Sequence, residues 1–112
     1  MAKYTRTYSG DAQSFDRLLQ KIENGVLNAS TSASLEDSWD RGEPGARCAV
    51  RVFERYSYAG GNRVSMSVTL FQTGDTIHLC AITSGGSQAV FFKINTLGEE
   101  AFLDTLRDVL DR

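Results

Sequence analysis

The residues with the clearest potential for covalent chemistry are His78, the single histidine, and Cys80, one of two cysteines. They stand two apart in a stretch that alternates like a β-strand, so both side chains face the same way. An imidazole beside a thiol can generate a nucleophilic thiolate. No obvious acidic residue accompanies the pair to orient the imidazole, and packing in a half-buried sheet face explains both residues more simply. A thiol-dependent enzyme is therefore the weakest hypothesis, and no catalytic residue is assigned.

Metal binding requires three or four ligands, which one histidine and two cysteines do not visibly assemble. We therefore expect no metal and no cofactor.

A glycine-rich segment could bind a ligand through its main chain. It follows a predicted strand and consists of Ser84, Gly85, Gly86, Ser87 and Gln88. Successive backbone amides in such a segment can form a nest that binds an anion. The segment lacks the glycine spacings of the P-loop and of the dinucleotide-binding turn, so a plain connecting loop is the alternative.

Three arginines, Arg47, Arg51 and Arg55, recur at every fourth residue of the strongest predicted strand, with Phe53 among them. Basic and aromatic side chains in a row can bind single-stranded nucleic acid. The formal net charge of the chain is −2, however, and acidic residues lie close by in the sequence. A solvated or cross-strand-paired row is the preferred interpretation, and no nucleic-acid partner is expected.

Hydrophobic periodicity predicts the elements that position these residues. A helix over residues 12–24 begins after Asp11 as its N-cap and ends at Gly25, which suits a left-handed C-cap. A second helix begins at a capping box formed by Thr96 and Glu99 and continues to the chain end. Strands are predicted at residues 3–8, 30–38, 47–58, 63–73, 76–83 and 89–95.

The turn at Gly74 and Asp75 predicts the pairing of two of these strands. A two-residue hairpin loop with glycine first sets apolar residues opposite one another, namely Leu70 opposite Leu79 and Val68 opposite Ala81, and it sets Phe71 opposite His78.

One side of the strand over residues 47–58 is apolar and is predicted to face the core. It consists of Cys48, Val50 and Val52. Setting Val52 opposite Val68 requires an odd-numbered, glycine-bulged loop near residues 60–61. In this register Cys48 faces away from Cys80, so no disulfide joins them.

The side chains predicted to lie together on the outer sheet face are Phe53, Phe71, His78, Cys80 and Ile82. A wholly solvated face would be cleanly polar, whereas this face is mixed. Cover by a second subunit, a loop or a ligand would explain the mixture, and so would singly scattered apolar residues, which are common.

The predicted fold class is α+β. Two helices with one apolar stripe each need one sheet face to pack against, which gives a two-layer sandwich of four to six antiparallel strands in the order β-α-β-β-β-β-(β)-α. A length of 112 residues, 41% hydrophobic and 23% charged, fits one domain over residues 1–112. No targeting signal and no membrane-spanning window is found, so a cytoplasmic location and no membrane partner are expected.

Three stretches of the sequence resemble a family of short, single-domain bacterial proteins of unknown function. They are residues 48–58 (CAVRVFERYSY), residues 81–88 (AITSGGSQ), and residues 91–96 (FFKINT) followed by Gly98, Glu99 and Glu100. The resemblance covers nearly the whole chain and implies a stand-alone bacterial domain. It implies no activity, ligand or catalytic residue.

The sequence leaves two main hypotheses for function. One is a non-enzymatic binding or interaction module that self-associates, as a homodimer, through the outer sheet face. The alternative is a small-ligand-binding protein, with a pocket either between the sheet and the helices or beside residues 84–88.

Overall fold

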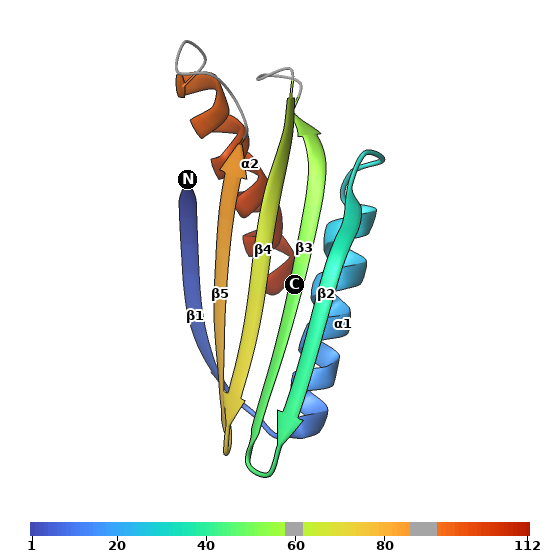
Figure 1. Cartoon of the computed structure of the whole chain (residues 1–112), viewed down its shortest axis with the longest axis vertical. Coiled ribbons are helices and arrows are strands. Elements are labelled where there is room, and N and C mark those ends of the chain that lie inside the picture. The colour runs from blue at the N-terminus through green and yellow to red at the C-terminus, as the bar shows by residue number, and fades with distance from the viewer. Residues whose placement is uncertain (58–61, 86–91) are drawn as a thin grey trace.

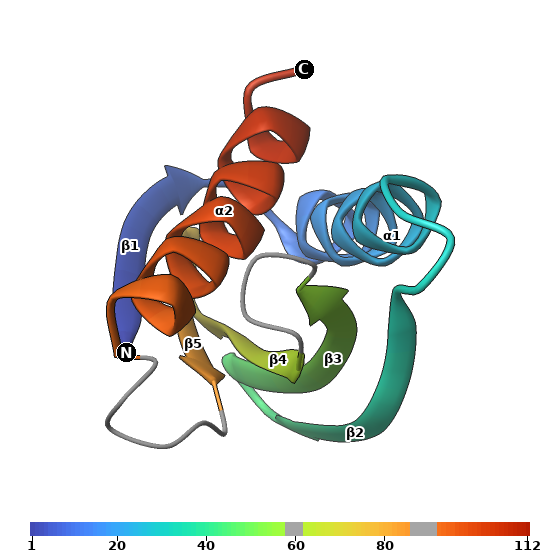
Figure 2. The same ribbon diagram turned by 90° about the horizontal axis from the view of Figure 1, so that it is seen from above.

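A five-stranded antiparallel sheet carries two helices on one of its faces in the computed structural model, which describes residues 1–57, 62–85 and 92–112, the side chains of residues 92–96 excepted (Figures 1 and 2). Along the sheet the strands run in the order β1-β5-β4-β3-β2, and every neighbouring pair is antiparallel. The elements are β1 (Ala2–Ser9), α1 (Ala12–Asn28), β2 (Ser34–Glu43), β3 (Ala46–Ser57), β4 (Asn62–Thr73), β5 (Thr76–Gly85) and α2 (Phe92–Leu110). The predicted α+β class and two-layer arrangement are confirmed.

The first helix begins where the sequence predicts and ends later. Asp11 caps α1 by accepting a hydrogen bond from the Ser14 amide at 2.9 Å. The predicted end at Gly25 is wrong, because α1 continues to Asn28. Gly25 instead allows a close helix–helix approach, since a Cβ placed there would lie 2.5 Å from a methyl group of Val109 in α2.

The hairpin of β4 and β5 has the predicted register. Leu70 pairs with Leu79, Val68 with Ala81 and Phe71 with His78. Gly74 adopts a φ of +56°, which favours glycine and closes the two-residue turn.

The orientation predicted for β3 is wrong by one residue. Val52 pairs with Ser67, not Val68, and Phe53 lies fully buried opposite Met66. The core side of β3 therefore holds Arg47, Ala49, Arg51, Phe53 and Arg55, while Cys48, Val50 and Val52 face the other way. The predicted odd-numbered loop is also wrong, because Ser57 pairs with Asn62 and four residues separate the two strands; residues 58–61 themselves lie outside the described residues.

Ion pairs explain how arginines occupy the helix-facing side of β3. Arg51 donates to Glu23 of α1 at 2.5 Å and to Asp40 of β2 at 3.0 Å. Arg47 pairs with Asp16 of α1 at 2.8 Å, and its guanidinium lies 4.3 Å from the ring centre of Phe15. The aliphatic stems of these arginines cover apolar core residues while their charged ends reach partners at the edge of the helix layer.

The C-terminal helix starts earlier than predicted. Residues 92–95 belong to α2, so the strand predicted over residues 89–95 is wrong there, and residues 89–91 lie outside the described residues. The predicted capping box is also wrong, because Glu99 lies inside the helix and is 5% exposed. Its carboxylate accepts a hydrogen bond from the Gly85 amide at 3.2 Å and pairs with the amino group of Met1. Its carbonyl accepts one from the Thr83 hydroxyl at 3.1 Å.

The weak strand predicted over residues 30–38 is shifted along the chain. Strand β2 spans Ser34–Glu43 at the sheet edge, with a register shift between Leu35 and Asp37. The core lies between the sheet and the helices, and its largest buried side chains include Phe15, Phe53, Phe102, Ile22 and Met66. Within the described part of the chain, no helix is long and apolar enough to cross a membrane.

Candidate functional site

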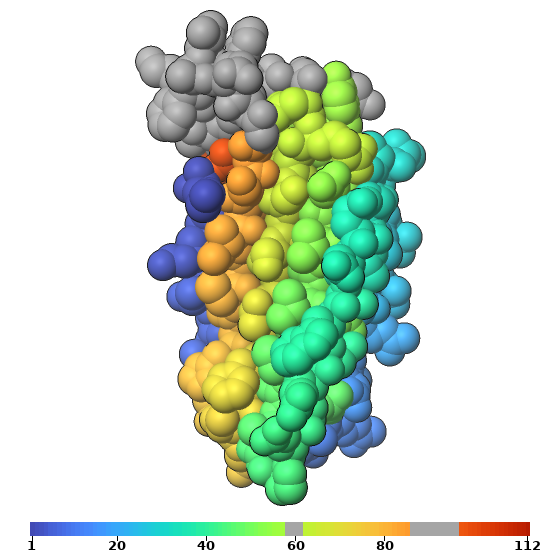
Figure 3. All heavy atoms as spheres, in the orientation of Figure 1, coloured from blue at the N-terminus to red at the C-terminus, as the bar shows by residue number. Residues whose placement is uncertain are grey.

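One face of the sheet is turned away from both helices, and we call it the open face (Figures 2 and 3). In the described part of the chain, no element packs on it. The large apolar side chains exposed there include Trp39 of β2, Phe71 of β4 and Ile82 of β5, which are 55%, 42% and 39% accessible. Val50 and Val52 of β3 are half-buried between them. The open face is therefore more apolar than the sequence predicts.

The structure brings four of the five predicted outer-face residues together. Phe71, His78, Cys80 and Ile82 all lie on the open face, on the two neighbouring strands β4 and β5. Phe53 does not, because it is buried in the core. The neighbouring residue Val52 lies on the open face instead, in one row with Ser67 and Ile82.

Sequence reasoning missed Trp39, the most exposed aromatic side chain on the open face. The predicted strand ended at residue 38, directly before Trp39, whereas β2 continues to Glu43. Residues 34–43 are largely polar and alternate weakly, so the pattern did not reveal the longer strand. The register pairs Trp39 with Val50. The signal that could have found it is the single tryptophan of the chain in a segment otherwise poor in apolar residues.

His78 and Cys80 lie on β5 in a shallow hollow of about 240 Å³ that is also lined by Thr5, Thr69 and Phe71. The imidazole stacks on Phe71, with ring centres 6.3 Å apart, and its Nδ1 lies 3.5 Å from the hydroxyl of Thr7. Among the described residues, no group of three or more His, Cys, Asp or Glu side chains could hold a metal ion.

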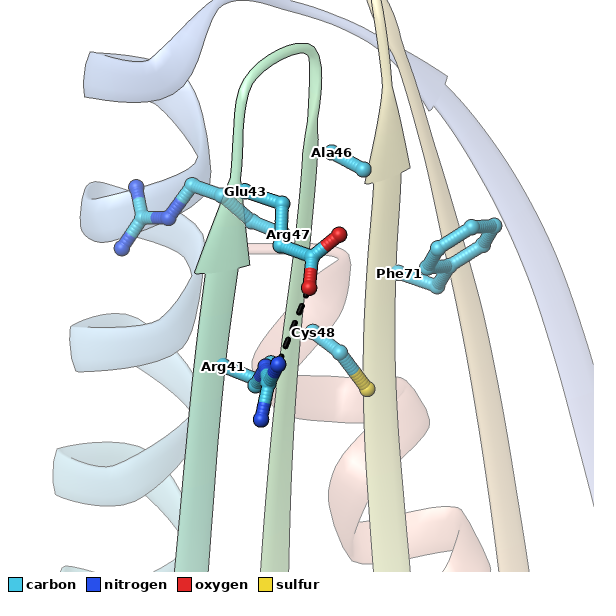
Figure 4. A pocket seen from close by; sticks show the side chains of 6 residues that line it. All are labelled: Arg41, Glu43, Ala46, Arg47, Cys48 and Phe71. Atoms are coloured by element: carbon cyan, nitrogen blue, oxygen red, sulfur yellow. Dashed lines mark hydrogen bonds and ion pairs between the residues drawn. The ribbon is translucent and has the colours of Figure 1, made fainter.

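A second hollow, of about 180 Å³, lies on the other side of Phe71 (Figure 4). An ion pair of Arg41 with Glu43, 3.0 Å long, borders it, and the thiol of Cys48 lies between this pair and Phe71. Cys48 thus shares the open face with Cys80, contrary to the predicted opposite placement, and both thiols are free. Phe71 lines both hollows, and it is the exposed large apolar side chain of the central strand β4.

The glycine-rich segment is described only at its start. Ser84 and Gly85 form the end of β5, and the Gly85 amide is engaged by the carboxylate of Glu99. Gly86, Ser87 and Gln88 lie outside the described residues, so the predicted anion nest stays a prediction.

A larger pocket opens on the helix side of the sheet, where α1 ends and the first half of α2 passes the end of β3. Its volume is about 570 Å³, and it is lined by Ala29, Ser30, Arg55, Tyr56, Ser57, Leu97, Gly98 and Ala101. Gly98 keeps the helix close to the strand, since a Cβ there would lie 2.6 Å from the Ser57 hydroxyl.

Arg55 is the charged group among the described residues that line this pocket. Its guanidinium donates to the Thr105 hydroxyl at 2.9 Å and lies 4.6 Å from the ring centre of Phe102. Burial lowers the pKa of Arg55 from its ordinary value. Arg55 is thus held between α2 and the sheet by one neutral hydrogen bond and one aromatic ring.

Comparison with known proteins identifies the family. The model of DUF6054, described as a family of unknown function, matches residues 1–112. The chain belongs to the DUF6054 family. The predicted resemblance to a family of unknown function is thereby confirmed, and no curated protein matches the chain.

The DUF6054 chain also resembles a solved structure. This is the crystal structure of PA94 from Pseudomonas aeruginosa, a protein of unknown function. The TM-score is 0.51 at 12% sequence identity, and the match covers 90% of this chain and 81% of PA94. At that identity the likeness concerns the fold alone.

Proposed function

We propose that this chain is a non-enzymatic interaction module that forms a homodimer through the open face of its sheet. The observation that carries the proposal is the exposure of Trp39, Phe71 and Ile82 on one uncovered sheet face. Large apolar side chains left exposed on an uncovered sheet face support an interaction surface. Aromatic side chains in particular supply most of the binding free energy at protein interfaces.

The order of the strands is compatible with a symmetric pairing of two open faces. A two-fold axis parallel to the central strand β4 would set β3 opposite β5 of the second copy and β2 opposite β1. Val52 would then face Ile82 of the second copy, and Phe71 would face its own equivalent, since each pair belongs to one row of the sheet.

Charges at the two edges fit the same arrangement. Lys3 of β1 and Asp37 of β2 lie at opposite ends of the row that contains Val52 and Ile82. The proposed axis would place each Lys3 opposite Asp37 of the second copy. Such rim charges select the orientation more than they add affinity.

The open face as a whole approaches the size of a specific interface. Five strands about 4.8 Å apart and ten or so residues long give a face of roughly 700 Å², close to the ~800 Å² that each partner contributes to a standard interface. The sheet curves around the helices, so the central strands would form the contact and the edge strands its rim (Figure 2).

Sedimentation equilibrium of Phe71→Glu tests the interface. A carboxylate at the centre of a buried apolar contact should weaken self-association by at least about 30-fold. Gln20→Glu is the matched control, because it adds the same charge to an exposed position of α1, on the other side of the sheet. A wild-type protein that is monomeric at 100 µM, on the order of the weakest specific dimers, would overturn the proposal.

A charge exchange tests the orientation. Lys3→Glu and Asp37→Lys should each weaken the dimer, because each sets like charges opposite one another, and the double variant should restore wild-type association. A double variant weaker than both single variants would show that the two copies meet in another orientation.

A further inference from the structure

The arginines of the sheet differ in one respect that points to a ligand. Six arginines lie in the described strands, and five of them pair with a carboxylate: Arg6 with Asp111, Arg41 with Glu43, Arg47 with Asp16, Arg51 with Glu23 and Asp40, and Arg63 with Glu54. All 14 Asp and Glu residues of the chain lie in the described ranges, and none of them forms an ion pair with Arg55. Arg55 is therefore a half-buried cation with no carboxylate partner among the described residues.

The guanidinium of Arg55 is held in place, but not all of its N–H donors have an acceptor. One nitrogen donates to Thr105, whose hydroxyl in turn donates to the Ala101 carbonyl at 3.2 Å, and the Phe102 ring supports one face of the group. A guanidinium carries five N–H donors, so several remain for a ligand. Residues fixed in this way lose little conformational freedom when they bind.

The rest of the pocket wall indicates the remaining part of the ligand. Ala29, Leu97 and Ala101 give it an apolar lining, and Ser30 adds a hydroxyl. A pocket of about 570 Å³ lies within the usual size range of small-molecule sites, which combine an apolar wall with a few placed polar groups. Among the described residues of this lining, Arg55 carries the one charged side chain.

We propose that the Arg55 pocket binds a small organic acid, with its carboxylate on the Arg55 guanidinium and its apolar part against Ala29, Leu97 and Ala101. The planar fork of a guanidinium matches the two oxygens of a carboxylate. One cation neutralises one carboxylate, whereas a phosphate dianion would keep an unbalanced charge beside an apolar wall.

Benzoate is a suitable probe because it combines one carboxylate with an apolar ring. Isothermal titration of the full chain should show that benzoate binds, while benzamide, its neutral analogue, and inorganic phosphate bind at least about tenfold more weakly. Phosphate or benzamide binding as tightly as benzoate would overturn the assignment of the ligand class, and an absence of benzoate binding at millimolar concentration would overturn the site.

Substitution of Arg55 tests the residue itself. Arg55→Met should lower the affinity for benzoate by at least about tenfold, while Arg63→Met, which removes an arginine outside the pocket, should leave it unchanged. The thermal midpoint of Arg55→Met should stay within about 3 °C of wild type, because removing a half-buried charge offsets the loss of the Thr105 hydrogen bond and the Phe102 contact. A large fall in the midpoint with unchanged benzoate affinity would show that Arg55 serves the fold alone.

Arg55→Lys keeps the charge and removes the fork, so it covers the case in which the methionine variant does not fold. Benzoate should bind this variant more weakly than wild type. Equal affinity would overturn the proposed bidentate contact.

Discussion

Arg51 joins three elements through a single side chain. Its guanidinium, on a side chain only 9% exposed, pairs with Glu23 of α1 and Asp40 of β2, and it also donates to the carbonyl of Val50 at 2.9 Å. The group is thus well supplied with acceptors at the boundary between the sheet and α1. A cation this deep would be costly without such partners.

Arg51→Met should destabilise the fold by about 1–3 kcal/mol, measured by urea unfolding. The reason is that Glu23 loses its partner in a half-buried position, whereas the exposed Asp40 can be rehydrated. Arg47→Met is the control, because its pair with Asp16 is more exposed and should contribute less than about 1 kcal/mol. Equal effects of the two substitutions would contradict the assigned role of Arg51.

At the scale of elements, the contact between the two helices depends on the absence of a side chain at Gly25. The nearest atoms to a Cβ there are both methyl groups and the Cβ of Val109, at 2.5 to 3.1 Å. The helices therefore pack at a distance that only glycine permits. Glycine lowers the intrinsic helix propensity of α1, and the close packing offsets that cost.

Gly25→Ala should lower the free energy of unfolding by about 1–3 kcal/mol, because an overpacked contact forces the two helices apart. Combining it with Val109→Ala should recover part of this loss, which a double-mutant cycle measures as a coupling of about 1 kcal/mol. Gly42→Ala is the control, since its added Cβ would meet one atom at 4.0 Å. Strictly additive effects of the two core substitutions would rule out the contact.

At the scale of the whole molecule, the helices protect one face of the sheet and leave the other uncovered by any described residue (Figure 1). If two copies share the open face, folding and association are linked, because only folded chains can associate through it. Stability then depends on protein concentration, which offers a readout independent of size measurements.

The thermal midpoint should rise by a few degrees for each tenfold increase in protein concentration above the dissociation constant. Phe71→Glu should remove this dependence and leave a concentration-independent midpoint. A wild-type midpoint that does not change with concentration would speak against the homodimer.

Local chemistry made several features predictable from sequence alone. The Gly74–Asp75 turn determined the pairing of β4 with β5, because glycine tolerates a positive φ and a two-residue loop permits a single register. Asp11 determined the start of α1 through a hydrogen bond within three residues. The α+β class followed from two helical stripes and a set of alternating strands.

Only the tertiary structure decided which side of β3 faces the helices. Apolar and polar residues alternate there, and the apolar half, Cys48, Val50 and Val52, lies outside the core. Long arginine side chains can share a face with Phe53 when acidic partners stand on α1 and β2, and those partners are far away in the sequence. Contacts between residues far apart in the sequence also determine three other features. They are the role of Gly25, the start of α2 and the unpaired charge of Arg55. Sequence therefore determined the elements and one hairpin, and packing determined the open face and the pocket.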